Sequence, residues 1–420
     1  MTLFSGCAAR RPLMDTSISR SFEGAISNSS LAVHPPGLPN VRAWGNIKND
    51  VFQKSMMDSF DQENQSGEFS KEINVLALSG GGDDGAYGAG FLCGLHVQKK
   101  LPRFKLVTGI STGALIAPYA FIGDHECIQI LSNSYTAVTP QSIFRFKSLF
   151  KMFRTDSVAD TRPLKKLLDK YVTERMVQKI AKEHLKGRRL YIQTTSLDAQ
   201  RPVIWDIGAI ATNAVGKSEL SHTNMEYTVN LIKEIMLASA SIPVFFPPVY
   251  IPMQFYTNGS SSKPYQFMFP EMHVDGGVAS QVFVTGGVLD LKEIKERIEK
   301  DGRTLNVYVI RNGKLGPDPR IVEPSLVKIA TRSSTTITKY DAAADIFRIS
   351  TIVKTLGGNF YLQFIPESFS TKSKRMFDNK YMRSLFEFGF QQAHHEKPWM
   401  NNLPEQFHYG LWSEDAKLGK

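Results

Sequence analysis

The sequence contains little cysteine and no recognisable metal motif. Three cysteines, Cys7, Cys93 and Cys127, occur in 420 residues, and such a small, odd number does not support a disulfide framework. Cys93 and Cys127 have apolar neighbours, so we expect both to be buried thiols. Since the sequence has no His-Glu-x-x-His motif and no paired cysteines, we predict no metal site and no cofactor.

Long apolar runs are also absent. No stretch of about 18–20 apolar residues occurs, so no transmembrane helix is predicted. Residues 3–7, Leu-Phe-Ser-Gly-Cys, are similar to the lipobox of bacterial lipoproteins, in which the cysteine is lipidated. Six residues before Cys7 are too few for the basic and apolar regions of a signal peptide. We therefore expect either a bacterial envelope protein anchored through Cys7, with its true start upstream, or a soluble or peripheral membrane protein.

The charge is mildly basic and unevenly distributed. Fifty Lys and Arg against 40 Asp and Glu give a formal net charge of +10. Residues 140–200 are the most basic part of the chain. A basic segment is attracted to anionic membranes or nucleic acid, but a solvated helical face explains most of these lysines equally well. We expect a membrane surface as partner and no nucleic acid.

The order of predicted elements indicates an α/β fold. Residues 1–70 are rich in Ser, Asn, Pro and Gly and are predicted to be a largely irregular tail. Beyond them, strand, turn and helix follow one another twice, which is typical of a parallel sheet. These elements are strands at 73–78 and 103–111 and helices at 86–99 and 112–122, the second helix closed by Gly123.

Later segments continue the alternation of helices and strands. The sequence predicts helices at 160–185, 228–242 and 325–356, and strands at 188–197, 201–207 and 305–313. We divide the chain into the tail, a catalytic core over 71–290, and a C-terminal strand and helices over 291–420 that complete or extend the core.

A nucleophile motif lies between the second predicted strand and its helix. Gly109-Ile-Ser111-Thr-Gly113 matches G-x-S-x-G, where a tight turn projects the serine hydroxyl and leaves room only for small flanking residues. The N-terminus of the following helix favours developing negative charge. An ordinary turn with Ser111 near the helix cap is the alternative.

Four glycines follow the first predicted strand. Gly80, Gly81, Gly82 and Gly85 fit G-x-G-x-x-G, but no Asp or Glu occurs between Asp84 and Asp124 to bind a ribose. No Gly-Lys-Ser/Thr follows either, so we predict no nucleotide as ligand. Free backbone N–H groups beside the serine would instead form an oxyanion hole.

A catalytic base is harder to identify from the residues alone. Among nine histidines only His273 lies near a motif, two residues before Asp275. Asp275-Gly276-Gly277 follows a short apolar stretch, but Asp-Gly is also a common turn.

Four blocks together resemble one known family. "GGGDDG", "GISTG", "ASASIPVFFPPV" and "DGG" occur in the order found in patatin-like phospholipases, over roughly residues 73–285. The resemblance implies a three-layer α/β fold with a central, mostly parallel sheet flanked by helices. It also implies a lipid acyl hydrolase with a Ser–Asp dyad, in which Ser111 is the nucleophile and Asp275 its base. Gly80, Gly81, Gly82 and Gly85 would form the oxyanion loop, and His273 would be structural.

One position departs from the family pattern. The family usually has Arg or Lys where this chain has Asp84, and Asp83 precedes it. Two carboxylates beside an oxyanion hole are expected to weaken anion binding unless they point outward or are paired.

Two segments are candidates for lipid contact. Residues 142–154 form a basic amphipathic pattern that suits a membrane interface, although a core helix or a lid over the acyl pocket would show the same pattern. The Pro-rich apolar residues 242–253 are expected to line that pocket.

Three functional classes follow. The first is hydrolysis of phospholipid or other acyl-lipid esters through an acyl-enzyme. The alternative is a catalytically silent lipid-binding or membrane-anchored envelope protein of the same fold. A nucleotide-binding oxidoreductase is the third.

Overall fold

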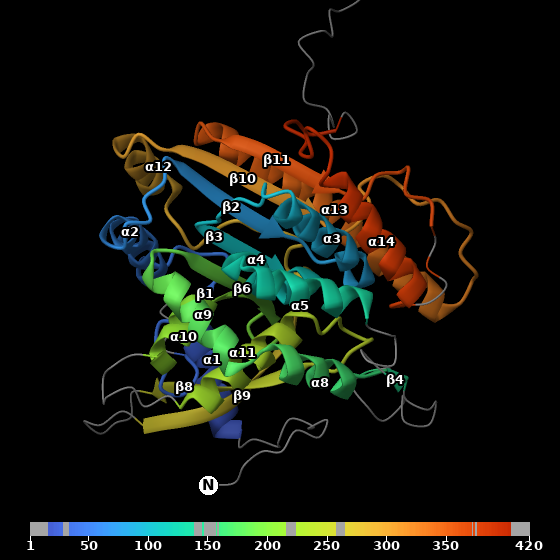
Figure 1. The fold of residues 1–420 in the computed structure, drawn as a ribbon. Helices are drawn as coiled ribbons and strands as arrows, with labels where there is room; N and C mark the ends of the chain where they lie inside the picture. Colours follow the sequence, from blue (N-terminus) through green and yellow to red (C-terminus); the bar gives the residue numbers. More distant parts are fainter. Residues whose placement is uncertain are drawn as a thin grey trace, which may run out of the picture.

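A mixed sheet with helices on both faces forms the body of the protein (Figure 1). The computed structural model describes residues 16–27, 33–137, 145–146, 157, 159–215, 224–257, 265–371, 373 and 376–404. The predicted α/β class, with a central and mostly parallel sheet, is confirmed.

The sheet has nine strands, and its main path runs β1-β7-β6-β3-β2-β10-β11. β6, β3, β2, β10 and β11 are mutually parallel, whereas β7, β1 and β9 run antiparallel to their neighbours. The strands are β1 (Arg42–Trp44), β2 (Glu72–Leu78), β3 (Leu106–Ile110), β6 (Arg189–Ser196), β7 (Arg201–Asp206), β8 (Val249–Thr257), β9 (Tyr265–Asp275), β10 (Thr304–Arg311) and β11 (Asn359–Phe364).

Both faces of the sheet are buried. Along β2, Leu76 and Leu78 belong to one hydrophobic core, and Val75 and Ala77 to the other. The alternation follows from the period of two along a strand, and burial on both faces explains why the last four residues of β2 are all apolar.

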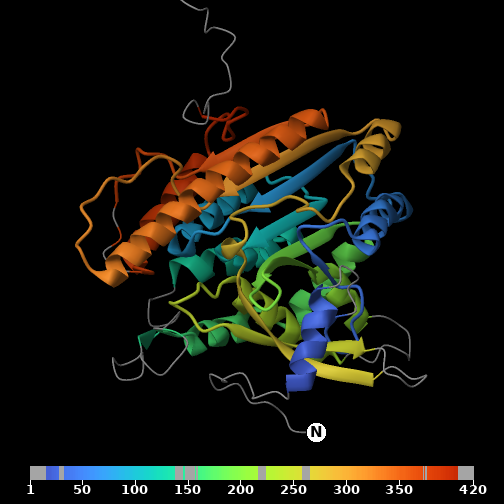
Figure 2. The same cartoon turned by 180° about the vertical axis from the view of Figure 1, so that it is seen from behind.

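Each core is covered by its own helices, and Figure 2 shows α13 crossing the back of the sheet. The first core includes residues of α1 (Thr16–Ser27), α3 (Gly85–Val97), α4 (Thr112–Ile122), α5 (His125–Thr136), α8 (Arg162–Tyr171), α9 (Glu174–Leu185), α10 (Ile207–Val215), α11 (Met225–Ser239) and α14 (Asn379–Gln392). The second includes residues of α2 (Asp50–Gln65), α12 (Leu291–Lys300) and α13 (Leu326–Thr355).

Strand β6 brings two distant strand ends together. Its first half pairs with β3, ending at Ile110 opposite Gln193. Its second half pairs with β9, beginning at Thr194 opposite Asp275. Because Gln193 and Thr194 are consecutive, the C-terminal ends of β3 and β9 meet at one point of the sheet.

The prediction of a largely irregular segment over residues 1–70 is wrong for the part the structure describes. Helix α1, strand β1 and helix α2 all pack onto the body. Phe22 of α1 stacks on Phe269 of β9 with ring centroids 3.8 Å apart, and β1 pairs with β7. The polar composition concealed these elements because each buries only a few apolar side chains against remote partners.

Other segments also differ from expectation. The β8–β9 hairpin was not predicted, and it occupies much of the Pro-rich apolar segment and its continuation. Of residues 142–154, only the two-residue strand β4 (Arg145–Phe146) is described, and it pairs with β5 (Ala159–Asp160). The remainder of that segment and Cys7 lie outside the described residues. None of the helices in the described ranges has the length and apolar character needed to cross a membrane.

Substitution Glu271→Gln is expected to lower the free energy of unfolding by about 3–5 kcal/mol, because it leaves a buried guanidinium unpaired. Arg42 of β1 pairs with Glu271 of β9, and both side chains are at most 1 % exposed. Chemical denaturation measures the effect. The control is Asp58→Asn, which breaks an exposed ion pair with Lys54 and should cost less than about 1 kcal/mol. Equal effects would show that the buried pair does not tie β1 to the body.

Candidate active site

Ser111 occupies a strained turn between β3 and α4. Its φ of 55° and ψ of −125° lie outside the regions that a non-glycine residue prefers. Among the described residues, its side chain makes no capping hydrogen bond to α4, so it does not behave as a helix cap. Its N–H donates to Ser239 Oγ at 3.0 Å. The hydroxyl therefore lies at the C-terminal end of a parallel strand and does not cap the helix that follows.

The flanking glycines are required by close backbone contact. A Cβ at Gly113 would lie 2.4 Å from the carbonyl oxygen of Leu78, and one at Gly109 would lie 2.5 Å from that of Gly113. The G-x-S-x-G pattern thus reflects packing of the turn against the neighbouring strand.

Asp275 reaches the same point from β9. Its N–H donates to Ser241 O at 2.9 Å, and its Oδ1 accepts from the N–H of Gly277 at 2.7 Å. Oδ2 is buried and accepts no hydrogen bond of ordinary geometry within the described part of the chain. A Cβ at Gly276 would lie 2.4 Å from Gln193 O, so the chain must turn on glycine directly after the aspartate.

Burial raises the pKa of the Asp275 carboxyl to about 7, while the Ser111 side chain and the Gly277 N–H act to lower it. Desolvation dominates because the carboxylate has no positive partner among these groups. A carboxylate with this pKa is a stronger base than an ordinary aspartate and matches the requirement of a general base near neutral pH.

Of the four glycines in the loop, two donate their N–H groups to carbonyls of the described part of the protein and two do not. The N–H of Gly80 donates to Gln281 O at 3.1 Å, and the N–H of Gly85 bonds to carbonyls of the preceding turn. The N–H groups of Gly81 and Gly82 donate to no protein atom among the described residues. Gly82 has a φ of +60° and lines a cavity together with Ser111. Of the four glycines predicted for the oxyanion loop, two therefore have N–H groups that could donate to a bound ligand.

The two unusual carboxylates are turned towards the C-terminal region. Asp84 accepts a hydrogen bond from the Tyr381 hydroxyl of α14, and Asp83 accepts one from the N–H of Phe377 at 3.0 Å. Burial and the neighbouring Asp83 raise the pKa of Asp84 to about 7, against the effect of Tyr381. Both carboxylates thus have hydrogen-bond donors. Paired carboxylates are not expected to weaken binding of an oxyanion beside the loop.

Residues beyond the matched blocks position the loop. Arg311 donates to Gly80 O at 2.9 Å, and Asn312 Nδ2 donates to Ser79 O at 2.8 Å. Gln281 Nε2 donates to Gly277 O at 2.6 Å, and the main-chain oxygen of Gln281 accepts from the Gly80 N–H. Arg311 and Asn312 end a predicted strand, but no signal in the sequence marked them because their role depends on β10 pairing with β2.

The cavity beside Ser111 is narrow and apolar, with a volume of about 90 Å³. Ile242 and Phe246 contribute to it, as expected of the Pro-rich segment. Other apolar walls come from α4, α8 and α11, including Leu115, Leu168 and Met236.

His273 belongs to a separate buried network. Its Nδ1 lies 3.0 Å from Thr194 Oγ1 and its Nε2 lies 3.1 Å from Glu271. Although burial alone would raise the pKa of Glu271, Arg42 and His273 hold it well below the ordinary range. These contacts support the structural role expected for His273.

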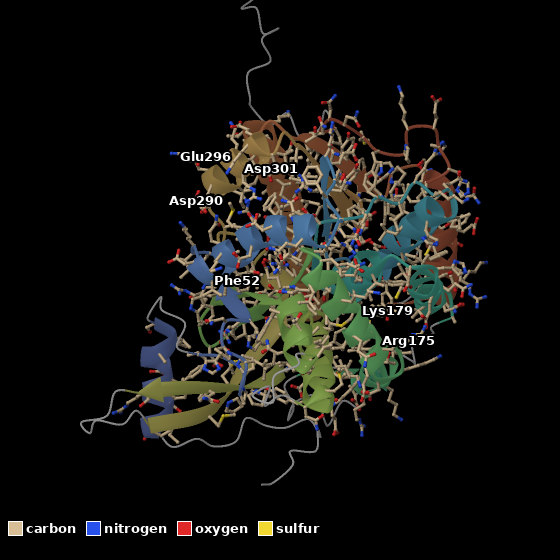
Figure 3. The ribbon with its side chains drawn as sticks, turned by 60° about the vertical axis from the view of Figure 1, so that its left-hand side comes forward. Phe52, Arg175, Lys179, Asp290, Glu296 and Asp301 are labelled. Carbon is tan, nitrogen blue, oxygen red and sulfur yellow. The ribbon has the colours of Figure 1, made fainter. Side chains whose placement is uncertain are left out.

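The basic segment is partly neutralised on helix α9, where Figure 3 shows Arg175 and Lys179 on neighbouring turns. Lys179 lies 2.6 Å from Asp124 and 2.7 Å from Glu126, and Arg175 lies 2.9 Å from Glu126. This face of the segment is therefore ion-paired and solvated. No group of residues suited to hold a metal ion occurs among the described residues.

Substitution Tyr381→Phe is expected to lower the free energy of unfolding by about 1–3 kcal/mol, because buried Asp84 loses its side-chain donor. Activity should fall less than it does on loss of either Ser111 or Asp275, since the Gly81 and Gly82 amides remain. Thermal melting and kcat/KM measure the two effects. Tyr340→Phe, at an exposed tyrosine of α13, serves as control and should change neither value. An unaltered Tyr381→Phe protein would mean that this hydrogen bond does not secure the loop.

One family model and several solved structures are similar to this chain. The family model for patatin-like phospholipases matches residues 76–286, half of the chain. VipD from Legionella pneumophila is similar in structure at 13 % identity and a TM-score of 0.30, with 77 % of this chain and 67 % of that chain covered. Human GIVD cytosolic phospholipase A2 is similar at 12 % identity and a TM-score of 0.25, with 71 % and 53 % covered. No curated protein sequence gave a significant match.

Proposed function

This chain belongs to the patatin-like phospholipase family, and we propose that it cleaves carboxylic ester bonds of phospholipids or other acyl lipids through Ser111 and Asp275. Family membership supports lipid acyl hydrolysis as the class of reaction. The observation that supports the dyad is the meeting of β3 and β9 on consecutive residues of β6. It brings a strained serine and a buried, basic carboxylate to one point.

The first half-reaction uses both residues and the glycine loop. Asp275 accepts the hydroxyl proton as Ser111 Oγ attacks the ester carbonyl carbon. The N–H groups of Gly81 and Gly82, together with the N-terminus of α4, stabilise the oxyanion of the tetrahedral intermediate. The intermediate collapses, Asp275 returns its proton to the leaving alcohol, and the acyl group stays on Ser111.

The second half-reaction repeats the same proton transfers with water. Asp275 removes a proton from water, which attacks the acyl carbonyl, and then protonates Ser111 Oγ as the carboxylic acid leaves. The apolar cavity lined by α4, α8 and α11 offers a place for the acyl chain next to Ser111. The pairing of Asp83 with Phe377 and of Asp84 with Tyr381 supports the proposal, because paired carboxylates are not expected to weaken oxyanion binding.

The test is turnover combined with covalent labelling of the full chain. We expect hydrolysis of p-nitrophenyl acyl esters and of phosphatidylcholine–phosphatidylglycerol vesicles, and labelling of Ser111 by a fluorophosphonate, located by peptide mass spectrometry. Labelling at another serine would contradict the assigned nucleophile. A folded chain that binds vesicles, yet neither hydrolyses lipid nor reacts with the probe, would instead support the lipid-binding alternative. Lipidation at Cys7 remains a separate proposal.

A further inference from the structure

A second cavity, much larger than the one beside Ser111, lies on the opposite face of the sheet. Its volume is about 520 Å³. Side chains of β2, β3 and β10 form its floor, and helices α2, α12 and α13 form its walls. None of its described lining residues lines the cavity at Ser111. The sheet therefore separates the two spaces.

The interior of this back cavity is apolar. Its deep walls include Phe60, Val75, Phe283, Ile298, Val307 and Val353, all buried. The volume falls within the range of small-molecule sites in proteins. Apolar cavities exclude water and accept apolar guests, so the occupant favoured by these walls is a flexible hydrocarbon chain.

Two polar side chains of the lining, Lys105 and Gln193, are already paired. Lys105 lies 2.9 Å from Glu63 and donates to Gly187 O at 3.1 Å. Gln193 Nε2 donates to Gly276 O at 3.1 Å and to Ser280 Oγ at 2.8 Å. These two side chains are therefore not available to a sugar or a nucleotide, either of which would need several unpaired donors and acceptors.

Two helices close the cavity on one side. Figure 3 shows α12, marked by Asp290, Glu296 and Asp301, next to α2, marked by Phe52. The two helices are joined by the ion pair between Arg297 and Asp61 at 2.7 Å. On the other side, Lys295 of α12 donates to Thr355 O of α13 at 3.3 Å. The side chain of Arg348 on α13 also lines the cavity and is exposed, so the cavity reaches solvent at this residue.

A cation stands at this opening. The Arg348 side chain is 62 % exposed and lies 2.7 Å from Asp345 Oδ1. The other Asp345 oxygen accepts hydrogen bonds from the N–H groups of Gln281 and Val282. The Asp345 carboxylate is therefore shared between Arg348 and these backbone donors. The printed bond to Asp345 uses one guanidinium nitrogen of this exposed side chain, and a guanidinium carries further N–H donors that suit a carboxylate.

We propose that the back cavity binds a long-chain fatty acid, with the hydrocarbon chain among α2, α12 and α13 and the carboxylate at Arg348. This goes beyond the proposed hydrolysis, because it assigns a second lipid site remote from the reacting atoms. One lining residue, Gln193, connects the back cavity to the dyad, because its side chain donates to the carbonyl oxygen of Gly276, directly after Asp275.

Fluorescence titration with cis-parinaric acid tests the site in the full chain carrying Ser111→Ala, which prevents turnover. We expect one saturable site per chain. Val307→Phe, which fills the back cavity, should weaken binding at least tenfold, and Arg348→Ala should weaken it about three- to tenfold. The matched controls are Leu115→Phe, which fills the cavity beside Ser111, and Lys354→Ala, an exposed cation of α13. Neither should change the affinity.

Competition separates a carboxylate from other acyl lipids. Palmitic acid should displace the probe better than methyl palmitate or palmitoyl-lysophosphatidylcholine, and this preference should disappear in Arg348→Ala. Equal displacement by all three in the parent would overturn the carboxylate assignment. Binding lost in Leu115→Phe and retained in Val307→Phe would place the ligand beside Ser111 and overturn the proposal.

A further variant keeps the test decisive if Val307→Phe does not fold, as judged by circular dichroism. Ile352→Lys places a charge on a half-buried residue of the cavity lining and should weaken probe binding at least tenfold, and unchanged binding would overturn the proposal. The two proposals can fail independently. Probe binding with the expected variant pattern, in a protein whose parent shows no esterase activity, would refute the hydrolase alone.

Discussion

Replacing Ser111 with alanine is expected to lower kcat by about 10⁴- to 10⁶-fold, the largest effect of any single substitution in this protein. The reason is that the proposed acyl-enzyme forms on this oxygen, so its removal abolishes the double-displacement route instead of slowing it. Any residual hydrolysis would come from water attacking a substrate still held by the Gly81 and Gly82 amides. The measurement is steady-state hydrolysis of a p-nitrophenyl ester, with circular dichroism to verify the fold.

Ser134→Ala is the matched control for this substitution. Ser134 also lines the cavity beside Ser111, but its hydroxyl donates to Ile130 O within α5. We expect its kcat to stay within about threefold of the parent, since surface or helix-internal changes of this kind perturb little. A Ser111→Ala protein that keeps a tenth or more of the parent activity would show that another group is the nucleophile.

Replacing Asp275 with asparagine is expected to lower kcat by about 10³- to 10⁴-fold at pH 8, the second-largest effect. Asparagine keeps the size and one carbonyl acceptor but cannot take the Ser111 proton. In the parent, kcat/KM should rise about tenfold per pH unit towards an apparent pKa near 7 and then level off, because burial raises the pKa of Asp275 to about 7. The variant should lose this step.

The same substitution should stabilise the protein at alkaline pH. An aspartate in the unfolded chain has a pKa near 4, so between about pH 4 and pH 7 the unfolded state releases a proton that the folded state retains. The free energy of unfolding therefore falls with rising pH across this window, by up to about 4 kcal/mol. Asp275→Asn removes the slope, and denaturant titration at pH 5 and pH 8 measures it.

The control for Asp275 is Asp206→Asn on β7. Burial raises the pKa of Asp206 to about 6, and its Oδ1 accepts the Ala209 N–H at 2.8 Å, away from the dyad. It should alter the pH dependence of stability and leave kcat/KM nearly unchanged. An unchanged activity profile in Asp275→Asn would contradict its role as the base.

The local sequence determined those features that depend on steric contacts between residues close together in the chain. The run of apolar residues in β2 reflects burial on both faces, and the flanks of Ser111 must be glycine because the turn packs against Leu78 O. Gly123 ends α4 at a φ of +70°, as its type predicts. Such signals lie within a few residues of their cause, so the α/β class and the serine turn could be predicted.

Only the tertiary structure decided which distant residues meet. Asp275 reaches Ser111 because β9 continues the edge of β6 where β3 ends, a pairing that no short pattern encodes. Asp84 meets Tyr381, and Arg42 meets Glu271, across most of the chain. The packing of α1, β1 and α2 could not be predicted for the same reason. Each has a few apolar side chains among polar ones, and only the folded body supplies the surface that buries them.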